Sequence, residues 1–530
     1  MSLSRCLRLS FSLLLALTTA AATARGQELA PTPASRESPA AQRDEPEVLQ
    51  AEAEMPQRLS PEEEQPAAEA YKLLFYDNDF QYLNDPSNQD FYLGDLLKQW
   101  RVGRRRRSVL DLGGEYRLRG MHEHNFRGLN LNNQNDDFLL QRTRFYGNLE
   151  LGDGVRLFGE GLDSATSFQR HAPLASEANG MEAVNLFADL RLFDGERGEL
   201  WGRIGRQELS FGNYRLLAPS EFANILRTFD GARLFWRGKA WDVDAFWTRP
   251  VAFGQLSPDQ ISPGQIDMTQ EMYGVWSTYE RPPPESELRQ EFGAIRPRSK
   301  HTFDFYYLGF NVYDAPISSA YPVDANFQTI GSRWRAREGN LLWELQGSYQ
   351  FGRYGADLQS AGMTVSGIGY ELPESPWEPE FWVFYDWASG NANPAGGTHG
   401  TFNQLLPWTH RYFGFMDLVG RQNIQDLNLQ ASASRGKHNL LLWYHIFHLA
   451  QARDALYNSS GAPIRISPSG AAGTYVGQEL DLLWQIVFNP RADVVIGYSH
   501  FFAGSFVKAT NPAGVSGNAD FYYSQWTWRF

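Results

Sequence analysis

Alternation of apolar and polar side chains, with a period of two residues, runs through the chain from Val109 onward. In 110–120 the leucines and a tyrosine fall on one face of an extended chain, and the charged side chains fall on the other. The segment WDVDAFW, 241–247, places tryptophans on one face and aspartates on the opposite face. Strict alternation predicts β-strands with two unlike faces, and no helical period of comparable length lies between them. The sequence therefore predicts an all-β fold.

Eighteen alternating segments predict eighteen strands, each of about the length that a tilted strand needs to cross a bilayer. They lie near 110–122, 137–151, 154–163, 182–193, 199–207, 226–236, 240–249, 270–280, 300–314, 326–336, 341–354, 361–371, 378–388, 421–433, 438–451, 476–488, 492–503 and 518–530.

The connections between these strands alternate in length. Short turns such as GD, RGK and NPRA follow the even-numbered strands, and long loops rich in Gly, Asn and Pro follow the odd-numbered ones, the longest at 389–420. Only 281–299 is a long excursion where a turn is expected. This pattern is typical of the outer-membrane porin type, an antiparallel transmembrane β-barrel with both termini on the periplasmic side. We expect the barrel to span 109–530.

The last ten residues, FYYSQWTWRF, also alternate. Tyr522, Trp526, Trp528 and Phe530 share one face, and Gln525 lies on the other. An apolar strand of this kind would invite pairing with other chains if its edge were open. We expect it to pair with 110–122 and so close the barrel, with Phe530 toward lipid at the periplasmic rim. The aromatic content of 14% fits girdles at both membrane interfaces.

The N-terminal part differs in character from the barrel. Residues 1–24 have two arginines, an apolar run and an A-x-A site, which predict a secretory signal peptide. Residues 25–70 are rich in Pro, Ala and Glu, with 11 acids against 4 arginines, and we expect a disordered acidic spacer. Residues 71–108 are aromatic and predict an ordered periplasmic segment. The predicted location is the outer membrane of a Gram-negative-type (diderm) bacterium.

The choice of cation is the main indication of what the lumen does. Of the 48 basic residues only six are lysines, and of these only Lys300, the first residue of 300–314, falls within a predicted strand. Guanidinium groups bind carboxylates bidentately and keep their charge in any environment. Alternation turns inward Arg117, Arg119, Arg142, Arg144, Arg156, Arg203, Arg233, Arg333 and Arg335.

Two interpretations of these arginines are open. They can stiffen the wall by pairing with inward acids, and a biased genome composition can raise Arg over Lys. Alternatively, a subset at the constriction selects anions. The predicted acidic partners are Asp111, Glu115, Glu150, Glu160, Asp189, Asp242, Asp244, Glu344, Glu479 and Asp481.

Catalytic and metal sites have little support in the sequence. HEH at 122–124 has no further ligand cluster near it, and no Ser, His and acid can be chosen that converge on one spot. Cys6, the only cysteine, lies in the predicted signal peptide. We therefore expect no enzyme activity, no cofactor, no metal site and no nucleic-acid partner.

Several segments carry a resemblance to a known family. They are YDNDFQYLNDPS (76–87), LGGEYRLRG (112–120), RIGRQELSFGNYRLLAPSEFANILRTFDGARL (203–234), WDVDAFWTRPV (241–251), SYQFGRYG (348–355), GTFNQLLP (400–407), YVGQELDLLW (475–484) and GYSHFFAGSF (497–506). The chain resembles the alginate export family of outer-membrane barrels from about 71 to 530, and 203–234 is the most specific part. Arg206 lies in that block, so it joins the predicted pore-lining residues. Alternation puts it on the opposite face from Arg203, so either a bulge turns it inward or it lies beyond the lipid.

The resemblance implies an eighteen-stranded barrel, and the family's best-known member passes a polyanionic uronate polymer. The expected function is a channel that passes anionic saccharides by passive diffusion. Its expected partners are outer-membrane lipid, an anionic saccharide or other small anionic solute, and periplasmic export or assembly partners. Two alternatives remain: a general or small-sugar-acid uptake porin, and a plugged surface barrel whose loops bind partners.

Overall fold

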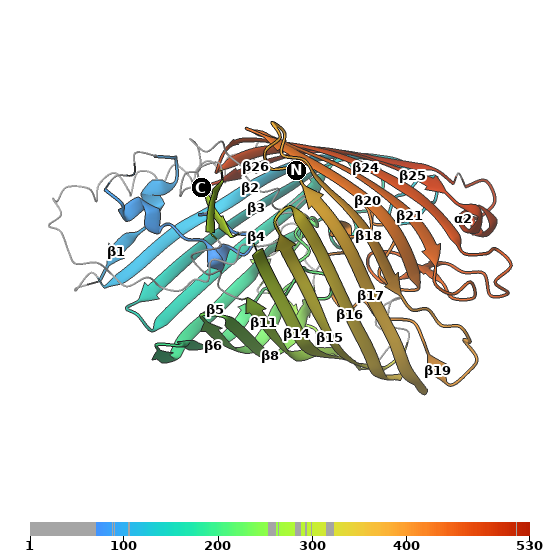
Figure 1. Cartoon of the computed structure of the whole chain (residues 1–530), viewed down its shortest axis with the longest axis horizontal. Coiled ribbons are helices and arrows are strands. Elements are labelled where there is room, and N and C mark those ends of the chain that lie inside the picture. Colours follow the sequence, from blue (N-terminus) through green and yellow to red (C-terminus); the bar gives the residue numbers. More distant parts are fainter. Residues whose placement is uncertain are drawn as a thin grey trace.

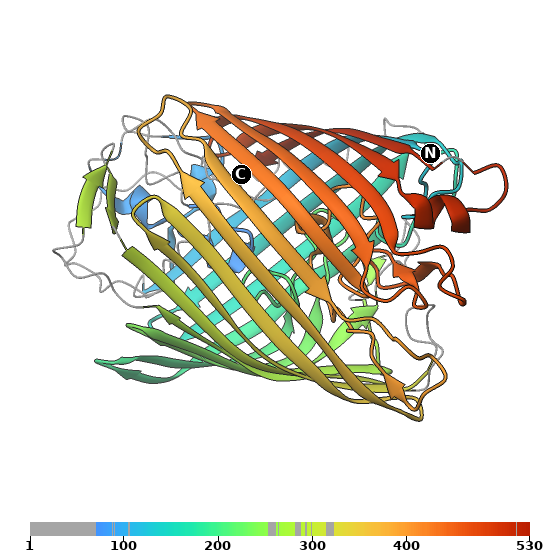
Figure 2. The same cartoon turned by 45° about the vertical axis from the view of Figure 1, so that its right-hand side comes forward.

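The computed structural model describes residues 70–86, 88, 91–103, 107–252, 261–262, 264–280, 288–291, 294–297, 299–313, 323–515 and 517–530. Eighteen long strands form one antiparallel barrel (Figure 1; Figure 2). They are β2 (Ser108–His124), β3 (Asp136–Leu151), β4 (Val155–Ser167), β5 (Asn179–Gly195), β6 (Gly198–Gln207), β7 (Phe229–Gly238), β8 (Trp241–Ala252), β11 (Gln270–Glu280), β14 (Ser299–Val312), β15 (Ala325–Glu338), β16 (Leu341–Tyr354), β17 (Asp357–Glu371), β18 (Glu380–Ala388), β20 (Ile424–Arg435), β21 (His438–Leu449), β24 (Tyr475–Asn489), β25 (Ala492–Ala503) and β26 (Ala519–Arg529).

The barrel closes between its first and last long strands. β26 pairs with β2 in a register that runs from Glu115 opposite Arg529 to His124 opposite Asp520. Among the described residues, closure leaves no long strand with an unpaired edge, which a bilayer requires. The predicted eighteen-stranded fold is confirmed, and the strands 270–280, 341–354 and 492–503 have the predicted bounds.

Alternation along the strands separates an exposed outer face from a buried inner face. In β26, Tyr522 and Trp526 are 45% and 44% exposed, whereas Gln525 and Thr527 are 6% and 2% exposed. The ring of Phe530 covers Gly114, where any added Cβ would collide with it. The last strand therefore has the facing that its sequence predicts.

Connections at one end of the barrel are mostly tight turns, such as 196–197, 239–240 and 436–437, and long loops join the strands at the other end. The sequence predicted a loop of six residues between strands 341–354 and 361–371, and this prediction is wrong. β16 and β17 run on until Tyr354 pairs with Asp357, and Gly355 makes the turn with a φ of +57°. Within the excursion 281–299, β12 (Leu288–Glu291) and β13 (Ala294–Pro297) form a hairpin, and the rest of it lies outside the described residues.

The wall has two places where a connection leaves it and folds inward. After β6, residues 208–228 enter the barrel, and β9 (Ile261–Ser262) pairs in parallel with β5 beside them. β10 (Gln265–Ile266) continues this patch against β8. After β18, residues 389–423 enter the barrel, and β19 (Thr398–His399) pairs in parallel with β17. Short strands thus complete the wall while longer segments fill the lumen.

The segment before the barrel packs against the inner wall at the end with the tight turns. It contains η2 (Phe75–Asp77), η3 (Gln81–Asn84), η4 (Asp95–Leu97) and β1 (Trp100–Val102), and β1 pairs with the start of β2. Its buried aromatic residues pack with aromatic rings of β3, β4 and β5; the cluster includes Phe75, Tyr76, Phe80, Tyr146, Phe158 and Phe187. The predicted signal peptide and almost all of the predicted spacer lie outside the described residues.

Small elements lie within the long loops. They are η6 (Thr409–Arg411), β22 (Leu456–Tyr457), β23 (Pro463–Arg465) and α2 (Ser505–Thr510). No helix in the described part of the chain is long and apolar enough to span a bilayer.

Candidate functional site

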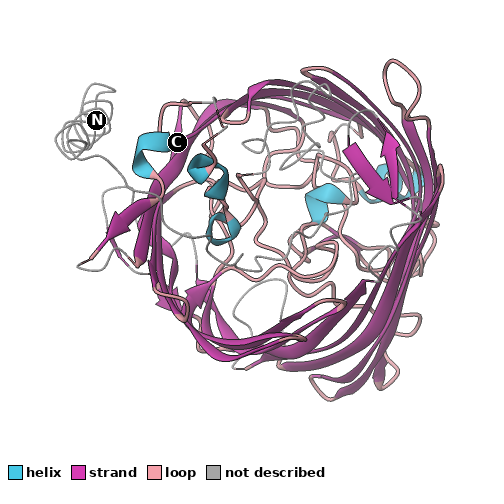
Figure 3. Cartoon of the chain, turned by 60° about the vertical axis from the view of Figure 1, so that its left-hand side comes forward, coloured by secondary structure: helices cyan, strands magenta, loops and turns pink. Residues whose placement is uncertain are grey.

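Loops cross the inside of the ring of strands (Figure 3). The two inward segments, 208–228 and 389–423, contact each other through backbone hydrogen bonds. Leu406 N donates to Leu216 O at 3.0 Å, and Ala218 N donates to Leu406 O at 3.0 Å. Trp408 N donates to Tyr214 O at 3.0 Å. These backbone hydrogen bonds satisfy polar groups that would otherwise be buried without partners. We call 208–228 the first inward loop and 389–423 the second inward loop.

Apolar side chains join both inward loops to the wall. Leu217 of the first loop and Phe413 of the second belong to one buried cluster with wall residues such as Trp276 and Trp443. Phe211 stacks on Trp276, with ring centroids 5.7 Å apart. Because these side chains are buried and in mutual contact, the middle of the barrel is packed where the loops meet.

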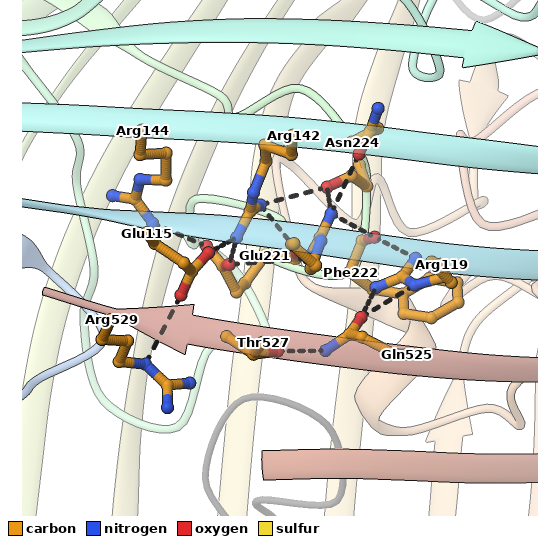
Figure 4. Close-up of polar contacts among 12 residues, drawn as sticks. Glu115, Arg119, Arg142, Arg144, Glu221, Phe222, Asn224, Gln525, Thr527 and Arg529 are labelled. Atoms are coloured by element: carbon orange, nitrogen blue, oxygen red, sulfur yellow. Dashed lines mark hydrogen bonds and ion pairs between the residues drawn. The ribbon is translucent and has the colours of Figure 1, made fainter. Parts of the chain in front are cut away.

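Glu221 of the first inward loop is held by arginines of the wall (Figure 4). Its carboxylate accepts a hydrogen bond from Arg142, lies 3.4 Å from Arg144 Nη1 and lies 3.7 Å from Arg117 Nη1. Arg142 also donates to Glu115 at 2.8 Å, and Arg144 donates to Glu160 at 2.6 Å. We call the following seven residues the arginine cluster: Arg117, Arg119, Arg142, Arg144, Glu115, Glu160 and Glu221.

Two of these arginines also bind the backbone of the first inward loop. Arg117 donates to Glu221 O at 2.9 Å and to Ala223 O at 2.8 Å. Arg119 donates to Phe222 O at 2.7 Å and to Gln525 Oε1 at 2.8 Å, and its guanidinium lies 3.8 Å from the centre of the Phe222 ring. A guanidinium group with five N–H donors can satisfy several carbonyls of a loop that has no regular structure.

The other predicted inward arginines on the wall contact acids. Arg203 forms a bidentate pair with Asp189, at 2.7 and 2.9 Å. Further pairs are Arg233 with Asp244 at 2.8 Å, Arg333 with Asp304 at 2.8 Å, Arg335 with Glu344 at 3.9 Å and Arg156 with Asp189 at 4.0 Å. The pattern agrees with the interpretation that most inward arginines stiffen the wall.

Arg206 does not lie with this inward set. It is paired in the sheet with Leu186, an outward residue that is 60% exposed, and it forms a bidentate pair with Asp230 at 2.8 and 2.7 Å. Gly264 covers it so closely that an added Cβ would lie 2.9 Å from Arg206 Nη1. Its burial therefore comes from the β9–β10 patch and not from a bulge that turns it into the lumen.

Some of the predicted acidic partners, including Asp111, Glu479 and Asp481, accept hydrogen bonds from groups other than arginine. Asp111 accepts the Gln99 backbone N–H at 2.6 Å. Glu479 accepts a hydrogen bond from the backbone N–H of Met416 at 2.9 Å, and the backbone nitrogen of the neighbouring Phe415 lies 3.4 Å from the Asp481 carboxylate. The second inward loop supplies backbone N–H groups to these carboxylates, so it is fixed to β24 without an arginine. Glu115, Glu160 and Asp189 do pair with arginines, as predicted.

Charge is unevenly distributed around the inner wall. The predicted arginines lie on β2 to β7 and on β15, whereas many buried acids lie on β17 to β25. These acids include Glu371, Glu380, Asp386, Asp426, Glu479, Asp481 and Asp493. Among the described residues, buried acids outnumber buried bases. Acids accompany the arginines on β2 to β7, whereas the buried acids on β17 to β25 have no buried arginine on the same strands within the described chain, so the two sides of the lumen differ in where guanidinium groups lie.

Sequence reasoning missed the charged residues of the inward loops. Arg215 pairs with Glu344, and Arg421 pairs with Asp386. Glu221 and Arg215 lie within 203–234, the part of the chain that most specifically resembles the family. That resemblance was the one feature of the sequence that could have pointed to them. Period-two alternation assigns faces only within strands, so it gave these loop residues no facing.

Burial changes the pKa of one group in the segment before the barrel. Lys98 Nζ lies between the rings of Phe80 and Tyr146 and donates to Leu112 O and Phe530 O. Burial lowers the pKa of Lys98 to about 7, against the opposing influence of the Asp111 carboxylate. The amine can therefore lose its proton close to neutral pH.

Comparison with known proteins gives the family. The alginate export family model matches residues 108–518, while no curated protein matches the sequence. Among solved structures, OpdK of Pseudomonas aeruginosa with vanillate is 11% identical with a TM-score of 0.50, and 79% of this chain covers 98% of that one. OccAB1 of Acinetobacter baumannii is also 11% identical with a TM-score of 0.50, and the match covers 79% of this chain and 96% of that chain. These two likenesses show the barrel fold alone. With the family model matched over nearly the whole barrel, the chain belongs to the alginate export family and is an outer-membrane channel protein.

Proposed function

We propose that the barrel passes anionic saccharides, of the uronate polymer or oligomer type, by passive diffusion along the arginine-bearing side of its lumen. Family membership supports a saccharide, and the arginine cluster supports an anionic one. The observation that carries the proposal is the convergence of four arginines on the first inward loop, where one carboxylate, that of Glu221, contacts three of them.

The contact of Glu221 with the wall arginines suggests how passage of the saccharide and opening of the channel are linked. A uronate carboxylate offers the same acceptor oxygens as Glu221, so it can replace that side chain on Arg142 and Arg144 with little loss of pairing. Exchange of partners avoids the cost of leaving a buried guanidinium without an anion. The first inward loop, once released by the substrate, can move away from the wall and widen the path.

A small-sugar-acid uptake porin is the second candidate function. The packed contact between the two inward loops favours it, because a small solute needs less displacement of the loops than a polymer does. In either case we place the tight-turn end in the periplasm, where the segment 71–108 would meet export or assembly partners.

Planar bilayer recordings test the proposal. Purified barrel should conduct with anion preference, and oligogalacturonates should block the current while neutral cello-oligosaccharides of the same length should not. Block by galacturonate monomer alone would favour the small-solute candidate. Cation preference, or a barrel that never conducts, would contradict the proposed channel and leave the plugged surface barrel.

A further inference from the structure

Arg411, at the end of η6 in the second inward loop, has no anionic partner in the described chain. It is 5% exposed, and its Nε and Nη2 atoms are buried without a hydrogen-bond acceptor among the described residues. Its guanidinium lies over two aromatic rings, with centroids at 4.7 Å for Tyr214 and 5.5 Å for Trp408. Two other buried arginines of the inward loops, Arg215 and Arg421, each pair with a wall carboxylate.

An unpaired buried charge is costly, because the ring contacts replace only part of the lost hydration. Buried polar groups almost always have a hydrogen-bond partner, in the protein or in a bound molecule or ion. The donors that remain on Arg411 thus indicate a missing acceptor, and the missing acceptor should carry negative charge.

A second orphaned donor lies on the same helical turn. The Trp408 indole Nε1 is buried without an acceptor among the described residues, and the side chain is 2% exposed. The rings of Trp408 and Tyr214 lie side by side, with centroids 6.0 Å apart and planes tilted by 44°. The site therefore combines donors without acceptors and aromatic faces, a set that suits a carboxylate attached to a ring with an apolar C–H face.

We propose that Arg411 and Trp408 form a binding site for the carboxylate of a uronate residue, and that the segment before the barrel closes this site. The identity of the saccharide rests on the proposed function. Arg411 Nε and Nη2 bind the carboxylate, Trp408 Nε1 donates to a ring or carboxylate oxygen, and Tyr214 packs against the sugar ring.

Leu73 provides the closure. It is half-buried and packs against the cluster of Tyr214, Ala218 and Trp408, as does Phe222 of the first inward loop. The same segment inserts Phe75 over Arg144, 3.7 Å from the ring centre, and Tyr76 over Arg203, 4.4 Å from the ring centre. Residues 70–83 therefore cover cationic groups that a uronate chain would otherwise reach, and the segment and the saccharide compete.

Calorimetric titration of the full chain in detergent with tetragalacturonate tests this site, with cellotetraose as the neutral ligand. Arg411→Gln should weaken tetragalacturonate binding by about tenfold or more, since charge-assisted hydrogen bonds are lost. Trp408→Phe keeps the ring and should weaken it less. Leu73→Ala should strengthen binding, because the competing segment is held less tightly. Arg435→Gln, an exposed residue beside the turn 436–437, is the matched control and should bind like the unchanged protein.

Stability of the empty barrel gives an independent measurement. If Arg411 lacks a partner in the chain, Arg411→Met should leave the thermal midpoint unchanged or raise it. A large drop would show a structural partner and overturn the site, as would equal tetragalacturonate binding by Arg411→Gln and the unchanged protein. Bilayer selectivity of the unchanged protein tests the channel separately: cation preference together with Arg411-dependent binding would contradict the proposed function and leave the site standing.

Discussion

The Glu221 carboxylate accepts a hydrogen bond from Arg142, and this contact joins the first inward loop to the inner face of β3 (Figure 4). The Arg142 side chain is 1% exposed, so the pair is shielded from water. Removing one partner of a buried pair typically costs about 3–5 kcal/mol, because the other charge is left without compensation.

Glu221→Gln should therefore loosen the first inward loop while the barrel itself still forms. We expect longer open times in single-channel recordings and faster protease cleavage between 208 and 228. Glu196→Gln is the matched control, because Glu196 is exposed in a tight turn. Gating identical to the unchanged protein would show that Glu221 does not hold the loop.

The Arg333–Asp304 pair predicts a double-mutant effect on stability. Arg333→Gln leaves Asp304, at 1% exposure, without its cation and should lower the midpoint of heat-modified gel mobility. The double change Arg333→Gln with Asp304→Asn should recover most of that loss, because neither charge is then buried alone. Additive losses in the double variant would contradict the pairing.

Facing in β26 predicts opposite results for two aspartate substitutions. Tyr522→Asp puts a charge on the lipid face, which costs up to about 4 kcal/mol at the midplane and less near the interface. Gln525→Asp keeps an acceptor for Arg119, whose Nε lies 2.8 Å from Gln525 Oε1, and should be tolerated. Membrane yield and heat-modifiable gel mobility measure the folding and insertion of both variants. Equal damage from the two changes would overturn the facing of this strand.

Lys98 predicts that docking of the segment before the barrel depends on pH. The pKa of Lys98 is lowered by burial to about 7 in the docked segment, whereas a free lysine titrates near 10.4. The docked state therefore binds fewer protons between these two values, and docking should strengthen as pH rises from about 7 to about 10. A spin label at Gln81→Cys should become less mobile over this range, and Lys98→Met should remove the dependence. Mobility that increases with pH would show the opposite linkage.

Deletions separate the spacer from the docked segment. Removing 25–69, which composition predicts to be disordered, should leave insertion and yield unchanged. Removing 25–83 also takes away Phe75, Tyr76 and Phe80, which pack on Phe158 and Phe187, and should raise basal conductance. Loss of insertion on deleting 25–69 alone would contradict the spacer prediction.

The strands and their faces could be predicted from the sequence because alternation is a local property. A period of two residues assigns each side chain in a strand to one face, whatever the strand pairs with. Arg117 and Arg142 are buried inside the barrel for this reason, and Tyr522 lies outside. Alternation also put Arg206 opposite Arg203, which the β5–β6 register confirms.

Only the tertiary structure decided what the inward side chains meet. Glu221 reaches Arg142 across a separation of 79 residues, and Asn213 reaches Glu344 across 131. Such contacts depend on where a loop folds after it leaves the wall, and loops have no period from which a facing can be inferred. The arginine pattern was readable along the strands, but the neutralising carboxylates, the packed middle of the lumen and the unpaired Arg411 arise from long-range packing, which sequence-local rules do not encode.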